Sequence, residues 1–276
     1  MEYVTRPPRP LLAELVDDVY YLEGAPPYPR LTLPPMPSAV LILNLGDPFR
    51  ITTGPTEAEY DDGCVVTTPS QHFRFSYPAY TRSVGVHFKP WGLAPFIGVP
   101  ASELRDHPVS VQHVWGSDTE ELRDRLDATP TPADKLTVLE NALLRRLHES
   151  AGLGLVQDVS GRIASHWGAV SIGDLSDAVG VSGNHLAHRF KQLVGITSKR
   201  LARTYRFARV VGAVEPSARV DWGELACRAG YFDQAHFIKE FHRFTGHTPT
   251  SYLDLRRRFL AEHPGHALNV GLLPCD

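Results

Sequence analysis

The sequence predicts a two-domain α+β protein, with a first domain rich in β-strands and a second domain built of helices. Three observations predict this fold class. The chain has 276 residues, more than an ordinary single domain. Its first half contains short apolar runs cut by turn residues, and its second half carries apolar residues at helical spacing. We place the first domain at residues 1–150 and the second at residues 155–260.

Apolar runs between Pro34 and Phe88 predict the strands of the first domain. Glycine, proline and aspartate, which are favoured in turns, separate many of them. The runs cover residues 39–45, 49–53, 63–68, 73–77 and 83–88. Several short strands in one domain are typical of a sandwich or a small barrel.

Two helices are expected to complete the first domain, over residues 117–126 and 132–148. The second carries one apolar stripe of leucines at intervals of three and four, namely Leu136, Leu139, Leu143 and Leu147. This stripe either packs on the domain's own sheet or pairs with the same helix of a second chain, as in a homodimer. Gly152 and Gly154 then mark a linker.

Charge is distributed unevenly along the chain. Residues 1–150 contain 13 Lys/Arg and 20 Asp/Glu, whereas residues 151–261 contain 15 and 9, so the second part is basic although the whole chain has net charge −3. A basic half favours a polyanionic partner for that half. No apolar run approaches the roughly 20 residues of a membrane span, and the start lacks a signal-peptide pattern. We therefore expect a cytoplasmic protein with no membrane partner.

The cysteines Cys64, Cys227 and Cys275 are odd in number and far apart, which fits neither a disulfide framework nor a zinc-ligand spacing. We expect reduced thiols. Cys227 lies among apolar helix positions and is predicted to be a small core residue.

The second half contains the same unit twice. Residues 172–180 are matched by residues 222–230 and, after one extra residue in the second copy, residues 182–195 align with residues 233–246. This internal repeat predicts two copies of one structural unit.

Each copy has the pattern of a helix, a tight turn and a second helix. A short amphipathic helix ends at Gly180 or Gly230, since glycine readily adopts the left-handed conformation, and Ser182 or Asp233 caps the next helix. This is the pattern of a helix-turn-helix unit.

The second helix of each copy has one apolar face and one outward face. The apolar face repeats at i, i+4 and i+7 and is predicted to be buried: Leu186, Phe190 and Leu193, then Phe237, Phe241 and Phe244. An α-helix fits the major groove of double-stranded DNA. The predicted base-contacting residues are the outward positions near each helix start: Gly183, Asn184, Ala187, His188, Gln234, Ala235, Ile238 and Lys239.

These side chains suit base edges in different ways. The amides of Asn184 and Gln234 can pair with adenine, Lys239 with guanine acceptors, and the small side chains permit close approach or contact with a thymine methyl group. Gly183 lowers helix propensity by about 1 kcal/mol in a helix interior and by less near a start. The first unit is therefore expected to recognise DNA more weakly or more adaptably. The alternative is that the outward positions are ordinary exposed residues.

Polar and basic residues around these helices are predicted to contact the DNA backbone, which gives affinity without sequence information. They are Ser182, Arg189, Lys191, Lys199, Arg200, Arg203 and Arg243. We expect about half of the basic ones to touch phosphate, the rest being solvated or paired within the protein. Arg206 is a candidate for a structural role, and residues 256–258 can serve either purpose.

Residues 155–253 resemble the DNA-binding domain of the AraC/XylS family of transcriptional regulators. The second copy carries the resemblance, through Gly-Tyr-Phe-Asp-Gln-Ala-His-Phe at 230–237, Phe241, and Gly-His-Thr-Pro-Thr-Ser-Tyr at 246–252. The resemblance implies a sequence-specific regulator in which a connecting helix, here 198–212, holds two recognition helices. These would enter successive major grooves, about 34 Å apart.

The resemblance also implies a cupin-like first domain that serves in effector binding or dimerisation. Residues 43–48, 84–90 and 99–104 are more loosely similar to such regulators. Implied partners are a small-molecule effector of unknown identity, a second copy of the chain, and RNA polymerase if the protein is an activator. A constitutive regulator without a ligand is the alternative. The aromatic residues Phe73, Phe75, Tyr77 and Tyr80 can line a pocket, but we favour a core role.

Nothing in the sequence favours catalysis. Metal-dependent cupins use clustered histidines, whereas this chain has no His-x-His, and only His72 and His87, on neighbouring predicted strands, form a candidate pair. A phosphate loop and a nucleophile elbow are also absent. We expect no enzyme activity, no cofactor and no metal, the alternative being a metal-binding cupin enzyme fused to a DNA-binding domain.

Overall fold

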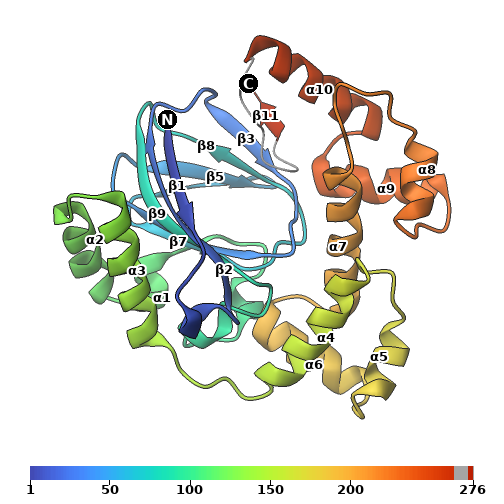
Figure 1. The fold of residues 1–276 in the computed structure, drawn as a ribbon, viewed down its shortest axis with the longest axis horizontal. Coiled ribbons are helices and arrows are strands. Elements are labelled where there is room, and N and C mark those ends of the chain that lie inside the picture. Colours follow the sequence, from blue (N-terminus) through green and yellow to red (C-terminus); the bar gives the residue numbers. More distant parts are fainter. Residues whose placement is uncertain (264–272, 276) are drawn as a thin grey trace.

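The computed structural model describes residues 1–263 and 273–275 (Figure 1). Two antiparallel sheets form the first part of the chain. The six-stranded sheet contains, in spatial order, β1 (Glu2–Arg6), β2 (Val16–Gly24), β9 (Thr81–Phe88), β4 (Ala39–Asn44), β7 (Gly63–Val66) and β10 (Val109–Ser110). The five-stranded sheet contains β11 (Leu273–Cys275), β3 (Arg30–Leu33), β8 (Phe73–Ser76), β5 (Phe49–Thr53) and β6 (Thr56–Tyr60).

All of the predicted strands are confirmed, with ends that differ by no more than two residues. The apolar pattern did not predict β1, β2, β3, β6, β10 and β11. Several of these carry charges where an alternating apolar pattern was sought. β1 and β6 are largely exposed, and β2 contains Asp17 and Asp18 at a point where its register with β9 shifts.

The six-stranded sheet is covered on both faces. In β4, Leu41 and Leu43 face the main core, while Ile42 packs into the space between the two sheets. A strand covered on both faces is apolar at nearly every position, which explains the continuous run of β4. Aromatic rings fill the space between the sheets, with Phe49 and Phe75 stacked at 4.7 Å between ring centroids.

The four aromatic residues that were candidates for either the core or a pocket do not all lie in the same environment. Phe73 and Phe75 are buried in the core, as favoured from the sequence, and Tyr77 packs against Phe75 with ring centroids 4.6 Å apart. Tyr80 is exposed.

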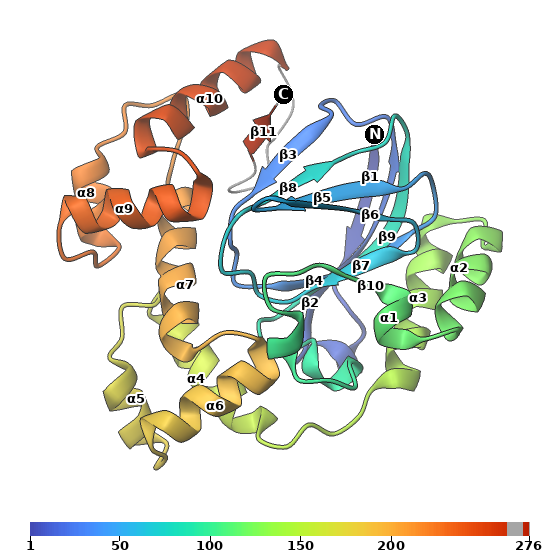
Figure 2. The same ribbon diagram turned by 180° about the vertical axis from the view of Figure 1, so that it is seen from behind.

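Helices cover the outer face of the six-stranded sheet (Figures 1 and 2). They are α1 (Val111–Trp115), α2 (Asp118–Ala128) and α3 (Pro132–Arg146), and the 3-10 turns η1 (Pro10–Leu12), η2 (Ala94–Phe96) and η3 (Ala101–Leu104) lie nearby in the chain. Leu136, Leu139 and Leu143 of α3 are fully buried in the main core, whereas Leu147 follows the helix and is exposed. The stripe thus packs within its own chain.

The second part of the chain is helical up to Glu262, as predicted. Its helices are α4 (Leu153–Ser165), α5 (Ile172–Ala178), α6 (Gly183–Val194), α7 (Ser198–Gly212), α8 (Trp222–Arg228), α9 (Gln234–Thr245) and α10 (Pro249–Glu262). Gly152, at φ +79°, precedes α4, but Gly154 lies inside α4 and is not part of a linker.

Two buried clusters meet inside α7. The main core runs from Leu12 to Ala202 and includes α6, so it extends across the expected boundary near residue 152. The C-terminal core runs from Phe207 to Tyr252 and includes Leu273 of β11. α7 therefore contributes one half to each core.

Candidate nucleic-acid interface

Two helix-turn-helix units lie in the second part of the chain, α5 with α6 and α8 with α9. The turn glycines Gly180 and Gly230 are left-handed, at φ +68° and +81°. Ser182 Oγ accepts a hydrogen bond from His185 N at 3.2 Å, and Asp233 Oδ1 accepts one from His236 N at 2.7 Å. Each second helix thus starts at a side-chain cap, which supplies a partner for a helix N–H group.

In the second helix of each unit, the inward residues are buried and the outward residues are mostly exposed, as the spacing predicts. The inward residues Leu186, Phe190, Leu193, Phe237, Phe241 and Phe244 are all buried. Of the eight predicted base-contacting residues, Ala187 is half-buried and the others are exposed. Contact of these residues with DNA stays a prediction.

The recognition helices α6 and α9 lie at opposite ends of α7 (Figures 1 and 2). Both begin on the side remote from the sheets and end toward them. A Cβ atom added to Gly195, which caps α6, would lie 3.3 Å from Thr67 Oγ1, and one added to Gly246, which caps α9, would lie 3.4 Å from His72 Cε1. Equivalent ends of the two helices therefore touch the first part of the chain, and the predicted base-contacting ends are free.

His72 lies at the second of these junctions. Its burial lowers the pKa of the imidazole, and the backbone of Arg243, near the end of α9, opposes this shift only in part. Burial also lowers the pKa of His247. A neutral imidazole is therefore favoured at the end of α9.

The candidate pair His72 and His87 is divided between the two sheets. His72 precedes β8, whereas His87 lies in β9 and its Nδ1 is 2.8 Å from Asp18 Oδ1. Within residues 1–263 and 273–275, no three His, Cys, Asp or Glu side chains are placed to hold a metal ion.

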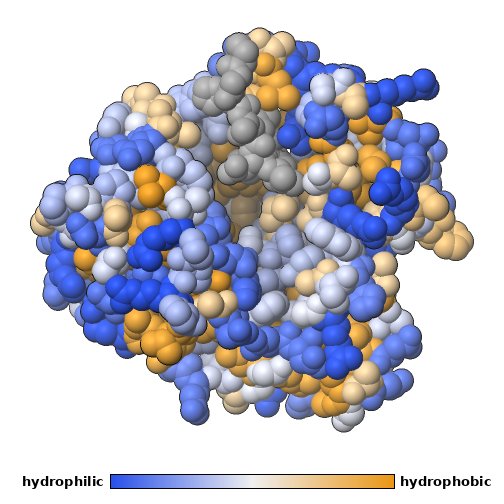
Figure 3. Space-filling model, in the orientation of Figure 1, coloured by the Kyte–Doolittle hydropathy of each residue, from blue (hydrophilic) through white to orange (hydrophobic). Residues whose placement is uncertain are grey.

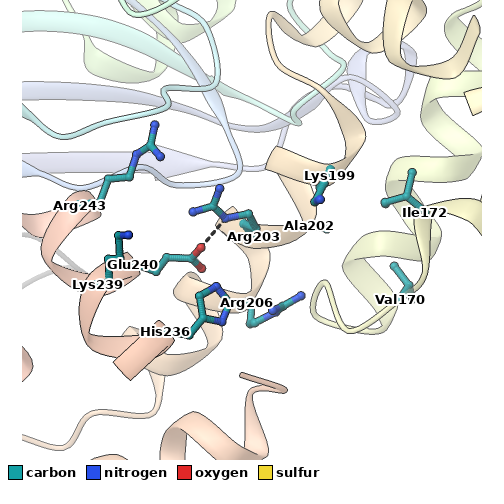
Figure 4. A pocket seen from close by; sticks show the side chains of 10 residues that line it. All are labelled: Val170, Ile172, Lys199, Ala202, Arg203, Arg206, His236, Lys239, Glu240 and Arg243. Atoms are coloured by element: carbon teal, nitrogen blue, oxygen red, sulfur yellow. Dashed lines mark hydrogen bonds and ion pairs between the residues drawn. The ribbon is translucent and has the colours of Figure 1, made fainter. Parts of the chain in front are cut away.

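A hollow of about 660 Å³ opens between the two units, beside α7 (Figure 4). It is lined by the basic residues Lys199, Arg203, Arg206, Lys239 and Arg243. The carboxylate in its lining, Glu240, is 2% exposed and accepts hydrogen bonds from Arg203 Nε and, at 3.0 Å, from the Tyr231 hydroxyl. The hollow thus carries excess positive charge, which suits a phosphate backbone. Figure 3 shows hydrophilic side chains on the side of the molecule that carries α7 and α9, mixed with apolar ones as over the rest of this face.

The predicted phosphate-contacting residues fall into two groups. Ser182, Lys191, Lys199 and Arg243 are exposed. The others have partners within the chain: Arg189 Nη1 donates to Gln192 Oε1 at 3.2 Å, Arg200 Nη2 donates to the Ser70 carbonyl at 3.1 Å, and Arg203 pairs with Glu240. Burial also lowers the pKa of Arg200.

Arg206 has partners within the chain as well. Its Nη2 donates to the Gly168 carbonyl at 3.2 Å, and its guanidinium lies 5.4 Å from the centroid of the Tyr231 ring. In the segment 256–258, Arg256 is buried and Arg257 donates to the carbonyls of Pro216 and Ala218.

Two residues near the second unit differ from the sequence analysis. Cys227 was predicted to be buried, but its neighbour Ala226 takes the inward position and Cys227 is exposed. Phe232 was not assigned a role, yet it is 93% exposed immediately before the cap Asp233. Its position in the turn before the second recognition helix was the one feature of the sequence that could have indicated this exposure. Cys64 is buried, and burial raises the pKa of its thiol.

Two family models match the chain, one in each part. Residues 175–255 match a helix-turn-helix domain, and residues 4–110 match a domain of unknown function (DUF6597). The matched helix-turn-helix domain marks the chain as a DNA-binding transcription regulator. Its helix-turn-helix domain, residues 175–255, is of the AraC type.

Solved structures with some similarity include ToxT from Vibrio cholerae, at 8% identity and a TM-score of 0.48, with 92% of this chain and 98% of that chain covered. The C-terminal domain of AraT, a response regulator from Geobacillus stearothermophilus, is 24% identical over 41% of this chain and 92% of that chain, at a TM-score of 0.34. No curated protein matches the sequence. None of the helices within residues 1–263 has the length and apolar character of a membrane span.

Proposed function

We propose that this regulator places α6 and α9 in successive major grooves of one DNA duplex and that a small molecule modulates it through the first domain, residues 1–150. The observation that carries the DNA geometry is the shared orientation of the two recognition helices. Their starts are free and exposed, their ends contact the rest of the chain, and a basic hollow lies between them.

Within this geometry, the outward residues at the helix starts contact bases. Asn184 and Gln234 pair with adenine, and Lys239 with guanine, because these side chains match the acceptors and donors of the major groove. The exposed Lys191, Lys199 and Arg243 contact phosphate. Arg200 and Arg203 chiefly position α7 and α9 through Ser70 and Glu240.

Modulation rests on the contacts between residues 67–72 and the DNA-binding part. Thr67 lies against the end of α6, the Ser70 carbonyl holds Arg200 of α7, and His72 lies against the end of α9. A ligand that shifts this one segment would act on both recognition helices. Thermal-shift screening of the full chain against metabolites tests this part. Consistent absence of stabilisation would favour the alternative, a constitutive regulator.

Selection of DNA fragments by the purified protein, followed by sequencing, tests the DNA geometry. We expect two conserved half-sites whose centres are about 10 base pairs apart, one turn of the duplex. A selected set without two such half-sites would contradict the arrangement, and no enrichment at all would contradict sequence-specific binding.

Self-association and contact with RNA polymerase complete the proposal. The leucines of α3 are buried in their own chain, so a homodimer would use a different surface. Light scattering during size-exclusion chromatography tests the dimer. Transcription in a reconstituted system tests the contact with the polymerase.

A further inference from the structure

Phe232 lies in an unusual environment for a large apolar side chain. It immediately precedes the helix cap Asp233, a position from which an apolar residue often packs against the fourth residue of the helix. Here that residue is Phe237, whose ring is covered by Tyr231 at 5.2 Å and by Trp222 at 6.1 Å between centroids. Phe232 is 93% exposed.

Two more exposed apolar residues follow Phe232, in the first turns of the second recognition helix. Ala235 and Ile238 follow at intervals of three, Ala235 is exposed and Ile238 is 39% exposed. We call Phe232, Ala235 and Ile238 the apolar strip. The buried face of the same helix is already filled by Phe237, Phe241 and Phe244, so the strip takes no part in the core.

The first unit has no counterpart to the strip. Val181 corresponds to Tyr231, because their N–H groups donate to the equivalent carbonyls of Ser176 and Ala226, so Phe232 is the extra residue of the second copy. The repeat aligns Ala235 with Asn184 and Ile238 with Ala187. Asn184 is polar, and Ala187 is half-buried. The difference is therefore specific to the second unit.

We infer that α9 recognises thymine through its 5-methyl group, with the apolar strip as the contacting surface; this rests on the proposed placement of α9 in a major groove. Thymine is the base that presents an apolar group in that groove. The surroundings favour DNA over an apolar protein partner, since Lys239 and Arg243 are exposed on the same helix and face the basic hollow.

Replacement of thymine by deoxyuridine tests the inference, because uracil lacks the methyl group and keeps every hydrogen-bonding atom. The duplex is the site selected by the full-length protein, with uracil introduced at one thymine at a time, and Kd is measured by fluorescence anisotropy at constant salt. We expect about a fourfold loss of affinity at one or two positions of the half-site bound by α9, the factor for one buried methyl-sized group. The same change in the other half-site should have no effect.

The double variant Phe232→Ala, Ile238→Ala should bind the thymine and uracil sites equally. The matched control is Leu11→Ala, which also removes an exposed apolar side chain but lies outside the DNA-binding part, and it should keep the thymine preference. Because Phe232 is exposed, circular dichroism and thermal unfolding of the Phe232→Ala single variant should match the wild type, which separates a lost contact from a lost fold.

Two results would overturn the inference and leave DNA binding intact: a wild-type protein indifferent to uracil throughout the α9 half-site, or a double variant that keeps the full thymine preference. If the double variant keeps that preference but loses activation by RNA polymerase, the strip contacts protein and the inference is wrong. Failure to select any DNA site would instead contradict the proposed function itself.

Discussion

The two helix-turn-helix units share their turns and caps but differ in what holds them. The second helix of the first unit, with Leu186 and Phe190, joins the same buried cluster as the six-stranded sheet. The second unit has a separate aromatic core in which Phe237 and Phe241 meet Trp222 and Tyr252. One local pattern has therefore been placed in two packing environments.

This difference indicates which unit can change position. Movement of the first unit relative to the sheets would disrupt a continuous core, which is costly. Movement of the second unit together with α10 would affect the middle of α7, the strand β11, the contact at His72 and the edge-to-face contact of Tyr28 with Phe259, but no continuous core. We therefore expect an effector that acts on the first domain to alter the placement of α9 more than that of α6.

The largest expected effect comes from truncating one equivalent phenylalanine in each unit. Phe190→Ala and Phe241→Ala should each destabilise their own core by about 3–5 kcal/mol, because each side chain is fully buried. Hydrogen exchange followed segment by segment should show faster exchange in the sheets and η3 for Phe190→Ala, and mainly in residues 204–262 for Phe241→Ala. Equal acceleration in the sheets for both variants would mean that the two cores do not act separately.

A smaller effect is expected from two lysines that differ in position. Lys239→Ala should lose discrimination at particular base pairs, at a cost of about 1–3 kcal/mol, as should Gln234→Ala. Lys199→Ala should weaken binding to all sequences alike. It should also reduce the slope of log affinity against log salt concentration by about one, the value for one phosphate contact. Affinity measured on a panel of single-base variants at two salt concentrations distinguishes them. An unchanged sequence preference for Lys239→Ala would refute the assignment of α9 to a groove.

Mild acid should loosen the second unit before the first. Burial lowers the pKa of His72 and His247 below the ordinary histidine value of 6.5, so the unfolded or detached state binds protons more readily than the folded state. The stability from these groups is present above pH 6.5 and is lost as the pH falls through that value toward their lowered pKa. Hydrogen exchange at the end of α9 should accelerate in that range. In His72→Gln this acceleration should be reduced, and a wild-type protein with no change between pH 7.5 and 5.5 would contradict the junction's role.

The second half was predictable because its signals are local. Turn glycines, the caps Ser182 and Asp233, and apolar residues at helical spacing all lie within 15 residues of one another in each copy, and they occur twice. The missed strands lack such signals: β1 and β6 are exposed, and β11 is recognisable only by its pairing with β3. The hydrogen-bond partners of the arginines could not be predicted from local sequence either, because Ser70 is 130 positions from Arg200 and Glu240 is 37 from Arg203.

The smallest effect concerns the position where the first unit has glycine and the second has Gln234. Gly183 is the first residue of α6, and a Cβ atom there would meet only Ser176 Oγ, at 4.0 Å, so alanine fits without strain. Gly183→Ala should stabilise the start of α6 by less than about 1 kcal/mol and tighten binding to the first half-site. The matched change, Gln234→Gly, should weaken the second half-site through both the lost amide and the looser helix. If Gly183→Ala changes neither affinity nor selectivity, the flexibility of the first recognition helix does not limit its binding to DNA. The two units would then differ only in the side chains that they present to DNA.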